Sequence, residues 1–226
     1  MNRRGFIKKS GLLVLGGMAA VGIESAAAAE TSETSETSEK WGLIIDLNRC
    51  TGCQSCVIAC KNQSKTISGN FNTRILSAET GSGSAARIVY TPVQCNQCDN
   101  PPCVAACPAH ATFKLANGIV VTDWDKCESN GACVESCPYG ARFLDSQHGN
   151  KADKCDFCLD RLALGLKPAC VESCPSKARI FGNMKRPRGE FAAYLNKAGL
   201  RVRKPEFNTG PQVHYIPSQH NKEGMI

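Results

Sequence analysis

Aromatic residues are scarce in this chain of 226 residues, at 6% of the sequence. Because so few large rings do not fill a conventional hydrophobic core, other material has to hold the fold together. Beyond the N-terminal region, no apolar run is long enough to span a bilayer. The sequence also lacks the patterns of a catalytic nucleophile, an acid–base pair or a phosphate-binding loop. We therefore expect a protein without a small-molecule substrate of its own.

Cysteine is the residue that the chain has in excess, with 15 copies. Disulfides, zinc sites and iron–sulfur clusters are the three explanations to weigh. An odd total leaves one cysteine over in a set of disulfides. Zinc sites commonly take their four ligands from two C-x2-C pairs. The spacing of the cysteines has to decide between these explanations.

The cysteines fall into four runs that all end in C-x3-C, and three of these endings continue into proline. The runs are Cys50, Cys53, Cys56 and Cys60; Cys95, Cys98, Cys103 and Cys107; Cys127, Asn130, Cys133 and Cys137; and Cys155, Cys158, Cys170 and Cys174. Such a repeat is typical of bacterial ferredoxins, in which the fourth cysteine of a run reaches a second cluster. Neither zinc nor disulfides require the repeated C-x3-C-P ending. Iron–sulfur clusters are therefore the favoured interpretation.

The first 29 residues resemble a twin-arginine export signal, with Arg3 and Arg4 before a modest apolar stretch and a small-residue cleavage site at Ala27-x-Ala29. A transmembrane anchor is the alternative, disfavoured because the stretch is short and rich in glycine and alanine. We expect export of the folded protein by the twin-arginine route to the periplasmic side of the cytoplasmic membrane. The polar repeat at 31–39 predicts a flexible linker over residues 30–40.

The formal net charge of +7 does not indicate nucleic-acid binding. Removal of residues 1–29 takes away four cations and one anion, which leaves about +4. Each iron–sulfur cluster adds about −2, so four clusters bring the total to about −4. The basic residues then partly compensate buried anionic clusters. The candidates for this compensation or for a partner contact are Lys154 and Arg161, and the candidate hydrogen-bond donors to cluster sulfide are Gln54, Asn96 and Gln97.

Local patterns predict a few short elements. A short strand is expected over residues 41–47, before the first cysteine run. Asn117-Gly118 predicts a hairpin within residues 111–123. A short amphipathic helix is expected over residues 189–199, ending at Gly199 and followed by a mostly extended tail.

The cysteine runs and their flanks resemble the four-cluster iron–sulfur subunits of molybdopterin oxidoreductases of the dimethyl-sulfoxide reductase type. The resemblance covers about residues 41–185, and within the family it is strongest to subunits of tetrathionate, thiosulfate and polysulfide reductases. The segments that carry it are CTGCQSCVIACK from residue 50, CNQCDNPPCVAACPAHATF from 95, GIVVTDWDKC from 118, CPYGARF from 137 and DKCDFCLDRLALGLKPACVESCP from 153.

This resemblance implies an α+β fold of two ferredoxin-like two-cluster modules, one inserted in the other, with short strands and helices and long loops. The outer module would cover residues 41–92 and 148–185, and the inner module residues 93–147. A C-terminal helix and extended tail would occupy residues 186–226.

The resemblance also assigns the ligands, because it joins run one with run four and run two with run three. The implied quartets are Cys50, Cys53, Cys56 and Cys174; Cys155, Cys158, Cys170 and Cys60; Cys95, Cys98, Cys103 and Cys137; and Cys127, position 130, Cys133 and Cys107. Asn130 stands where the sixteenth cysteine would be. We expect three 4Fe-4S clusters and, at Asn130, a 3Fe-4S cluster, because an amide is a poor iron ligand. A 4Fe-4S cluster with the Asn130 oxygen, water or hydroxide on one iron stays open, as does loss of that cluster.

The implied function is electron transfer between a membrane-embedded quinone-interacting subunit and a molybdopterin catalytic subunit, in a sulfur-compound reductase. The alternative is the equivalent subunit of a nitrite-reduction, hydrogenase or sulfite-reduction-associated membrane complex. A structural zinc-binding module is the rival from a different class. A free soluble ferredoxin is disfavoured, because four clusters suit a fixed chain of electron carriers.

Overall fold

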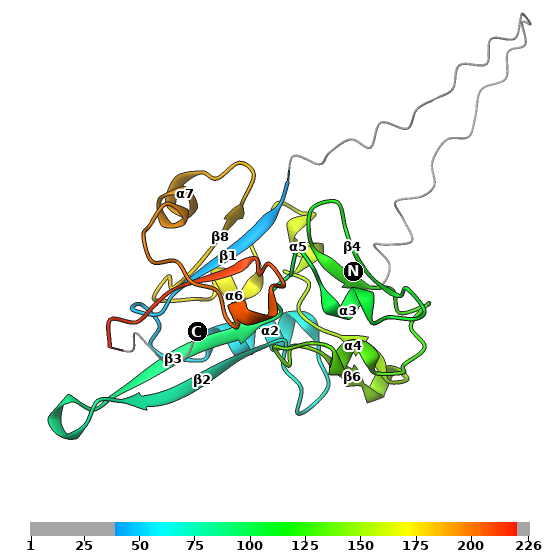
Figure 1. The fold of residues 1–226 in the computed structure, drawn as a ribbon, viewed down its shortest axis with the longest axis horizontal. Coiled ribbons are helices and arrows are strands. Elements are labelled where there is room, and N and C mark those ends of the chain that lie inside the picture. Colours follow the sequence, from blue (N-terminus) through cyan, green and yellow to red (C-terminus); the bar gives the residue numbers. More distant parts are fainter. Residues whose placement is uncertain (1–38, 221–226) are drawn as a thin grey trace, which may run out of the picture.

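The computed structural model describes residues 39–220. The predicted export signal and nearly all of the predicted linker lie outside these residues. Short strands and helices joined by long loops make up the described part, as expected for an α+β protein (Figure 1). In chain order these elements are β1 (Trp41–Asp46), α2 (Ser55–Ser64), β2 (Thr73–Thr80), η2 (Gly83–Ala85), β3 (Arg87–Gln94), α3 (Pro102–Ala105), β4 (Thr112–Lys114), β5 (Val120–Thr122), α4 (Ala132–Glu135), β6 (Phe143–Asp145), η3 (Ser146–His148), β7 (Lys151–Asp153), α5 (Leu159–Leu162), α6 (Ala169–Glu172), β8 (Arg179–Asn183), α7 (Gly189–Leu195), η4 (Pro205–Phe207) and β9 (Val213–Ile216).

A three-stranded sheet of order β8-β1-β9 lies at the centre of the described residues. Strand β1 runs antiparallel to β8, with Ile44 opposite Ile180, and parallel to β9, with Leu43 opposite Val213. The side chains of Leu43, Ile44 and Ile45 are each at most 1% exposed. A strand with neighbours on both edges and cover on both faces reads as a continuous apolar run. The strand predicted before the first cysteine run is thus confirmed.

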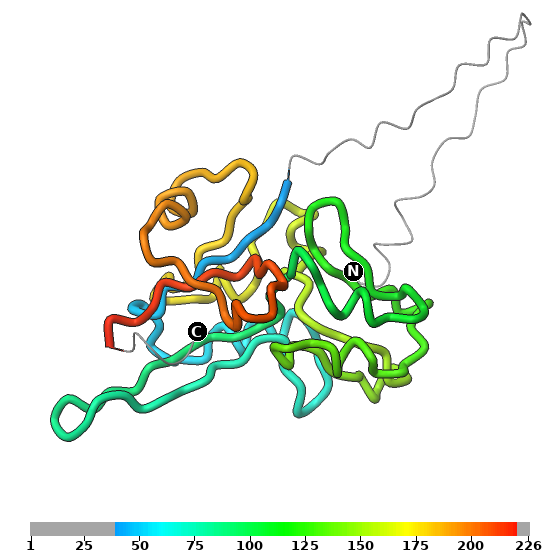
Figure 2. Tube along the Cα trace, viewed as in Figure 1, coloured from blue at the N-terminus to red at the C-terminus, as the bar shows by residue number. Residues whose placement is uncertain are grey.

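The C-terminal tail packs along its own chain. It returns beside β1 as strand β9, which Figure 2 shows as the red segment next to the blue one. Tyr215 of β9 is buried, and its hydroxyl donates to the Pro92 carbonyl at 3.0 Å. The prediction of an extended tail is confirmed for this segment. Its partner is β1, which the sequence did not reveal.

Three hairpins complete the strands of the described chain. Strands β4 and β5 form the hairpin predicted at Asn117-Gly118, and Gly118 has the positive φ of +84° that such a turn requires. The β2–β3 hairpin is longer and projects from the body of the molecule (Figure 1). Together with the β6–β7 hairpin, it was not predicted. The predicted module boundaries at 92/93 and 147/148 fall inside β3 and between β6 and β7.

Helix α7 is the amphipathic helix expected near the C-terminus. It buries Phe191 and Tyr194 against β1 and β8, and it ends at Leu195, four residues before Gly199. Elsewhere in the described residues, α2 packs against α6 and α3 packs against α4. These two pairs bring run one to run four and run two to run three. No helix between residues 39 and 220 has the length and apolar character needed to cross a membrane.

Cysteine supplies much of the buried core. One buried cluster packs Cys56, Cys95, Cys155 and Cys170 around β1 residues. A second packs Cys103, Cys127 and Cys133 against the β4–β5 hairpin and β7. The cysteine side chains therefore occupy the positions that large apolar residues take in most folds.

Candidate metal centres

The first and fourth cysteine runs surround two cavities. One is lined by Cys50, Cys53, Cys56 and Cys174, and the other by Cys60, Cys155, Cys158 and Cys170. Each set is one of the quartets that the family resemblance implies. Each quartet takes three ligands from one run and the fourth from the other. The fourth ligands are Cys174, just after α6, and Cys60, on α2, and the packing of α2 against α6 brings them into place.

The third implied quartet also converges. The Cys98 thiol interacts electrostatically with Cys95, Cys103 and Cys137. Cys95 and Cys98 follow β3, Cys103 lies on α3, and Cys137 follows α4. The packing of α3 against α4 therefore brings one ligand of run three to three ligands of run two.

The fourth group contains three cysteines and Asn130. Cys127 and Cys133 share one buried cluster, and Cys107 packs against it. Asn130 is exposed, and its Oδ1 accepts a hydrogen bond of 3.0 Å from the backbone N–H of Ala132, the first residue of α4. The amide oxygen is thus occupied at the start of a helix.

The spacing within the quartets suits a multi-atom group. All 15 cysteines lie within the described residues, and none of them forms a disulfide. In the same part of the chain, no three His, Cys, Asp or Glu side chains are arranged to hold a single metal ion. A zinc ion needs its sulfur ligands at about 2.3 Å, which draws four of them tightly together. Sets of four cysteines that converge without forming a single-ion site fit an iron–sulfur cluster instead.

Burial controls the ionisation of the cysteine thiols. It raises the pKa of Cys98 to about 12, and it raises the pKa of Cys103 and Cys155 above the usual thiol value. Such thiols stay protonated at neutral pH unless a bound metal deprotonates them. Cys53 differs because it is exposed, and hydrogen bonds with Ser55 lower its pKa. The buried thiols therefore fit metal ligands and do not resemble free nucleophiles.

Three cations are buried among the cysteines. Arg142, Lys154 and Arg179 are 5%, 4% and 3% exposed, and within residues 39–220 none of them forms an ion pair with a carboxylate. Arg179 donates to the Cys170 sulfur at 3.6 Å, and Arg142 and Lys154 act electrostatically on Cys103. Burying an unpaired cation costs several kcal/mol. Anionic clusters held by these cysteines would supply the missing counter-charge.

Several buried polar atoms next to the runs have no hydrogen-bond partner within the described residues. They include both amide atoms of Asn96, Gln94 Nε2, Ser136 Oγ, Arg142 Nε and Arg179 Nε. Buried donors of this kind are almost always satisfied in folded proteins. Cluster sulfide and thiolate sulfur accept hydrogen bonds from such groups. The donor set beside the cysteines thus fits iron–sulfur clusters as well as the ligand set does.

The remaining sequence candidates have various roles. Lys154 donates to the carbonyls of Val120 and Cys155, so it is buried next to a ligand, whereas Arg161 pairs with Glu172 nearer the surface. Gln97 joins two backbone groups: Nε2 donates to the Cys155 carbonyl and Oε1 accepts from the Val120 N–H, both at 2.8 Å. Gln54 precedes α2 and is exposed.

The sequence reading missed Arg142 and Arg179, although a repeat marks them. Run three continues as C-P-Y-G-A-R and run four as C-P-S-K-A-R. Each arginine therefore stands five residues after the last cysteine of its run. In run two the same position holds Thr112, which accepts a hydrogen bond from Arg142.

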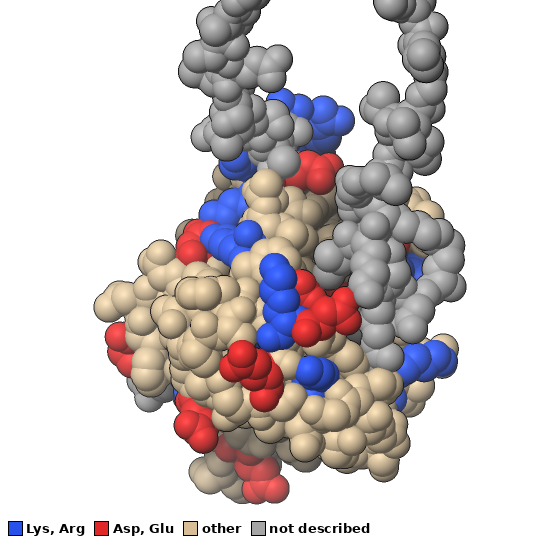
Figure 3. All heavy atoms as spheres, turned by 90° about the vertical axis from the view of Figure 1, so that its right-hand side faces the viewer, with Lys and Arg blue, Asp and Glu red and all other residues tan. Residues whose placement is uncertain are grey.

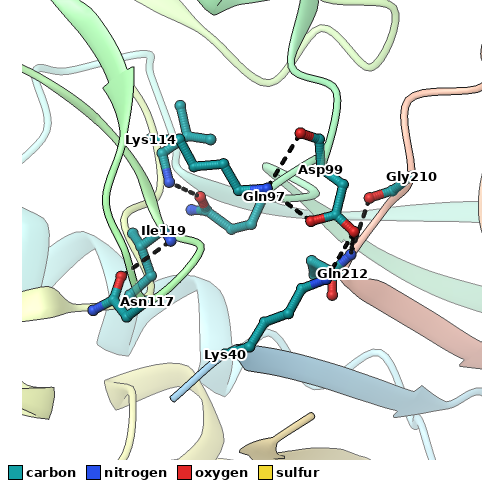
Figure 4. Close-up of polar contacts among 9 residues, drawn as sticks. Lys40, Gln97, Asp99, Lys114, Asn117, Ile119, Gly210 and Gln212 are labelled. Carbon is teal, nitrogen blue, oxygen red and sulfur yellow. Dashed lines mark hydrogen bonds and ion pairs between the residues drawn. The ribbon is translucent and has the colours of Figure 1, made fainter. Parts of the chain in front are cut away.

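Asp99 lies at a junction next to the third quartet (Figure 4). Its carboxylate pairs with Lys40 at 2.8 Å and Lys114 at 2.7 Å, and Gln212 Nε2 donates to it at 3.0 Å. Burial opposes ionisation, but the hydrogen bonds from Lys114 and Lys40 prevail and lower the pKa of Asp99. These contacts join the start of β1, the β4–β5 hairpin and the tail. Lys40, the last residue of the predicted linker, is thus anchored.

The tail also reaches the cysteines at this junction. The Asp99 N–H donates to the Gly210 carbonyl at 2.8 Å, and the Gln212 N–H donates to the Asn96 carbonyl at 2.8 Å. The buried Thr209 hydroxyl hydrogen-bonds with the Cys98 thiol. Residues of the tail therefore cover one side of the third quartet.

The molecular surface near the third quartet and the Asp99 junction carries charges of both signs. On the face shown in Figure 3, basic and acidic side chains are interspersed. A mixed distribution of this kind creates no extended field of one sign.

Comparison with known protein families identifies the class of protein to which this chain belongs. Residues 49–111 and residues 86–184 each match a family described as a 4Fe-4S dicluster domain. These matches and the 15 cysteines support iron–sulfur clusters, about four in number.

Relatives narrow the class. A tetrathionate reductase subunit of Salmonella typhimurium is 40% identical over 181 residues, which cover 78% of this chain and 72% of the relative. The thiosulfate reductase electron transfer subunit PhsB of Salmonella typhi is 39% identical over 82% of this chain and 96% of the relative. A polysulfide reductase polypeptide of Wolinella succinogenes is 36% identical over 83% and 98%. This protein belongs to the family of iron–sulfur subunits of dimethyl-sulfoxide-reductase-type molybdopterin oxidoreductases.

The junction at Asp99 generates a prediction about the tail. Replacing Asp99 by Asn removes both ion pairs but keeps the side-chain shape. Because the three side chains are about one-third exposed, we expect a modest loss of stability of about 1 kcal/mol. Hydrogen exchange should accelerate at the Gln212 amide, which the junction holds against Asn96.

Glu190→Gln is the matched control, because it removes an exposed ion pair, with Arg49, that involves none of Asp99, Asn96 and Gln212. It should leave the Gln212 amide unchanged. Equal exchange at this amide in the Asp99→Asn variant and the parent would show that the junction does not hold the tail.

Proposed function

We propose that this chain relays electrons between a membrane-embedded quinone-interacting subunit and a molybdopterin catalytic subunit, in a complex that reduces a sulfur compound. The observation that carries the proposal is the arrangement of four cysteine groups, with their buried cations, within one small chain. A fixed series of redox centres moves electrons over a distance without binding a substrate. The relatives named for tetrathionate, thiosulfate and polysulfide reductases support the class of the complex.

The packing of the described residues supports the paired assignment of ligands. Runs one and four meet where α2 packs against α6, and runs two and three meet where α3 packs against α4. We accordingly assign the first two quartets to an outer module and the other two to an inner module. The clusters supply one-electron redox chemistry when bound. The chain's own contribution is to hold them, exclude water with β1 and the tail, and place cations beside their ligands.

Asn130 sets the type of the fourth cluster. Its Oδ1 accepts the Ala132 N–H, so the oxygen is engaged and does not point freely toward iron. This geometry supports a 3Fe-4S cluster held by Cys107, Cys127 and Cys133, with three 4Fe-4S clusters at the other quartets. It counts against the alternative in which the Asn130 oxygen ligates a fourth iron. Water or hydroxide on that iron is the competing state, because the position is exposed.

We place the working protein on the periplasmic side of the cytoplasmic membrane, after export in the folded state. The support is the resemblance of residues 1–29 to a twin-arginine signal. Export of a folded chain allows clusters to be inserted before the protein leaves the reducing cytoplasm.

Isolation from native membranes tests the relay itself. We expect the chain to be recovered with a molybdopterin-containing subunit and a membrane subunit, and its visible absorbance to bleach when a quinol is added. Recovery with a catalytic subunit for another acceptor would retain the relay and replace the substrate class. Recovery alone, with no response to quinol in the membrane, would contradict the proposal.

A substitution tests the cluster at Asn130. The anaerobically purified chain should contain about fifteen irons and show a 3Fe-4S electron paramagnetic resonance (EPR) signal when oxidised. Asn130→Cys restores the missing thiolate, so iron should rise to about sixteen and the oxidised signal should disappear. Asn130→Ser is the control, because it replaces the amide without supplying a thiolate.

About sixteen irons and no oxidised signal in the parent would show that water or hydroxide completes a fourth 4Fe-4S cluster. Iron close to zero after careful reconstitution would overturn the electron-transfer proposal and return zinc to consideration.

A further inference from the structure

Arg179 occupies a position between two of the cysteine quartets. It is the first residue of β8, five residues after Cys174, and only 3% of it is exposed. One guanidinium nitrogen donates to Gln94 Oε1 at 2.6 Å, and the other donates to Thr73 Oγ1 at 2.9 Å. The contacts with Gln94 and Thr73 leave the guanidinium little freedom to move.

The guanidinium contacts ligands of both outer quartets. It donates to the sulfur of Cys170 at 3.6 Å, and it lines the same cavity as Cys56, with which it interacts electrostatically. Cys170 belongs to the quartet completed by Cys60, whereas Cys56 belongs to the quartet completed by Cys174. Arg179 itself lines the cavity of the second of these quartets, while its partners Thr73 and Gln94 line the cavity of the first.

The base of the β2–β3 hairpin provides the anchor for this arginine. Thr73 and Gln94 face each other across the first pair of the hairpin's register. Arg142 is held in a parallel way, by Thr112 and Thr122, which face each other at the base of the β4–β5 hairpin. It acts electrostatically on Cys103 of the third quartet, a site different from those of Arg179. In two separate places, therefore, a buried arginine next to cysteine ligands is held by the two facing side chains at the base of a hairpin.

A fixed cation next to redox centres changes their potentials in a known direction. Reduction adds negative charge, and a nearby positive charge stabilises the reduced form, most strongly where water is excluded. The guanidinium of an arginine stays protonated in proteins at any working pH, so Arg179 carries its positive charge at this site.

We propose that Arg179 is a shared positioning residue that raises the reduction potentials of both outer clusters. The proposal rests on the iron–sulfur content proposed above, and it adds a residue that coordinates no iron. The β2–β3 hairpin then has a defined task, which is to hold this cation at a fixed orientation.

The test is a potentiometric titration of the full, iron-loaded chain, followed by EPR. Arg179→Met removes the charge and keeps an apolar stem, so two of the cluster potentials should fall. In Arg179→Lys the two potentials should fall less than in Arg179→Met, because lysine keeps the positive charge but lacks the planar group that donates to both sides. Arg142→Met is the matched control, which should move a different potential and leave those two in place.

A gentler variant keeps the test decisive if Arg179→Met loses its clusters. Gln94→Glu is nearly isosteric and retains Arg179, but its carboxylate neutralises the cation at the existing 2.6 Å contact. The same two potentials should fall while the iron content stays at the parental value.

Unchanged potentials at normal iron content in Arg179→Met or Gln94→Glu would overturn this proposal and leave the proposed function intact. A shift of only one potential, or the same shift in Arg142→Met, would overturn the shared role. Absence of iron from the parent chain would overturn both proposals.

Discussion

The constraint on which this structure depends is the pairing of buried positive charge with cysteine sulfur. Arg142, Lys154 and Arg179 are buried without carboxylate partners in the described chain, and sulfur ligands are the negative groups beside them. Without clusters, burial keeps the thiols neutral, so they provide no negative charge for the cations. The buried cations then remain unpaired, which is unfavourable. Bound clusters satisfy both at once. We therefore expect folding and cluster insertion to be coupled, as they are in small proteins that are organised around a metal.

This coupling explains why the secondary structure is so short. Helices α3, α4, α5 and α6 have only four residues each, too few to be stable without tertiary contacts. Helices α3, α4 and α6 each carry one cysteine and pack against a helix of another run. The continuous apolar structure is confined to β1 and its two neighbours. The tail contacts the Asp99 and Cys98 region just before it joins the sheet as β9. It therefore links the cysteine sites to the sheet.

The sequence predicted the features that are written locally. The four runs, the strand before Cys50, the turn at Asn117-Gly118 and the helix containing Phe191 and Tyr194 all carry short-range signals, and the structure places each where expected. The pairing of β9 with β1 joins the two ends of the described chain, so no local pattern reveals it. The β2–β3 hairpin contains Pro92, a residue that weakens a strand prediction although an edge position tolerates it. Arg142 and Arg179 were missed because an arginine in sequence gives no sign of burial, although the repeated C-P-x-x-A-R was visible.

The most direct test of this account compares amide hydrogen exchange in the iron-loaded chain and in the same chain after anaerobic removal of iron. The account predicts that, without iron, protection collapses around Arg142, Lys154 and Arg179 and along β1, because the buried cations have lost their counter-charge. The exposed tip of the β2–β3 hairpin should exchange quickly in both states. Full protection around the three cations in the iron-free chain would contradict the account, since the fold would then hold its buried charges without clusters.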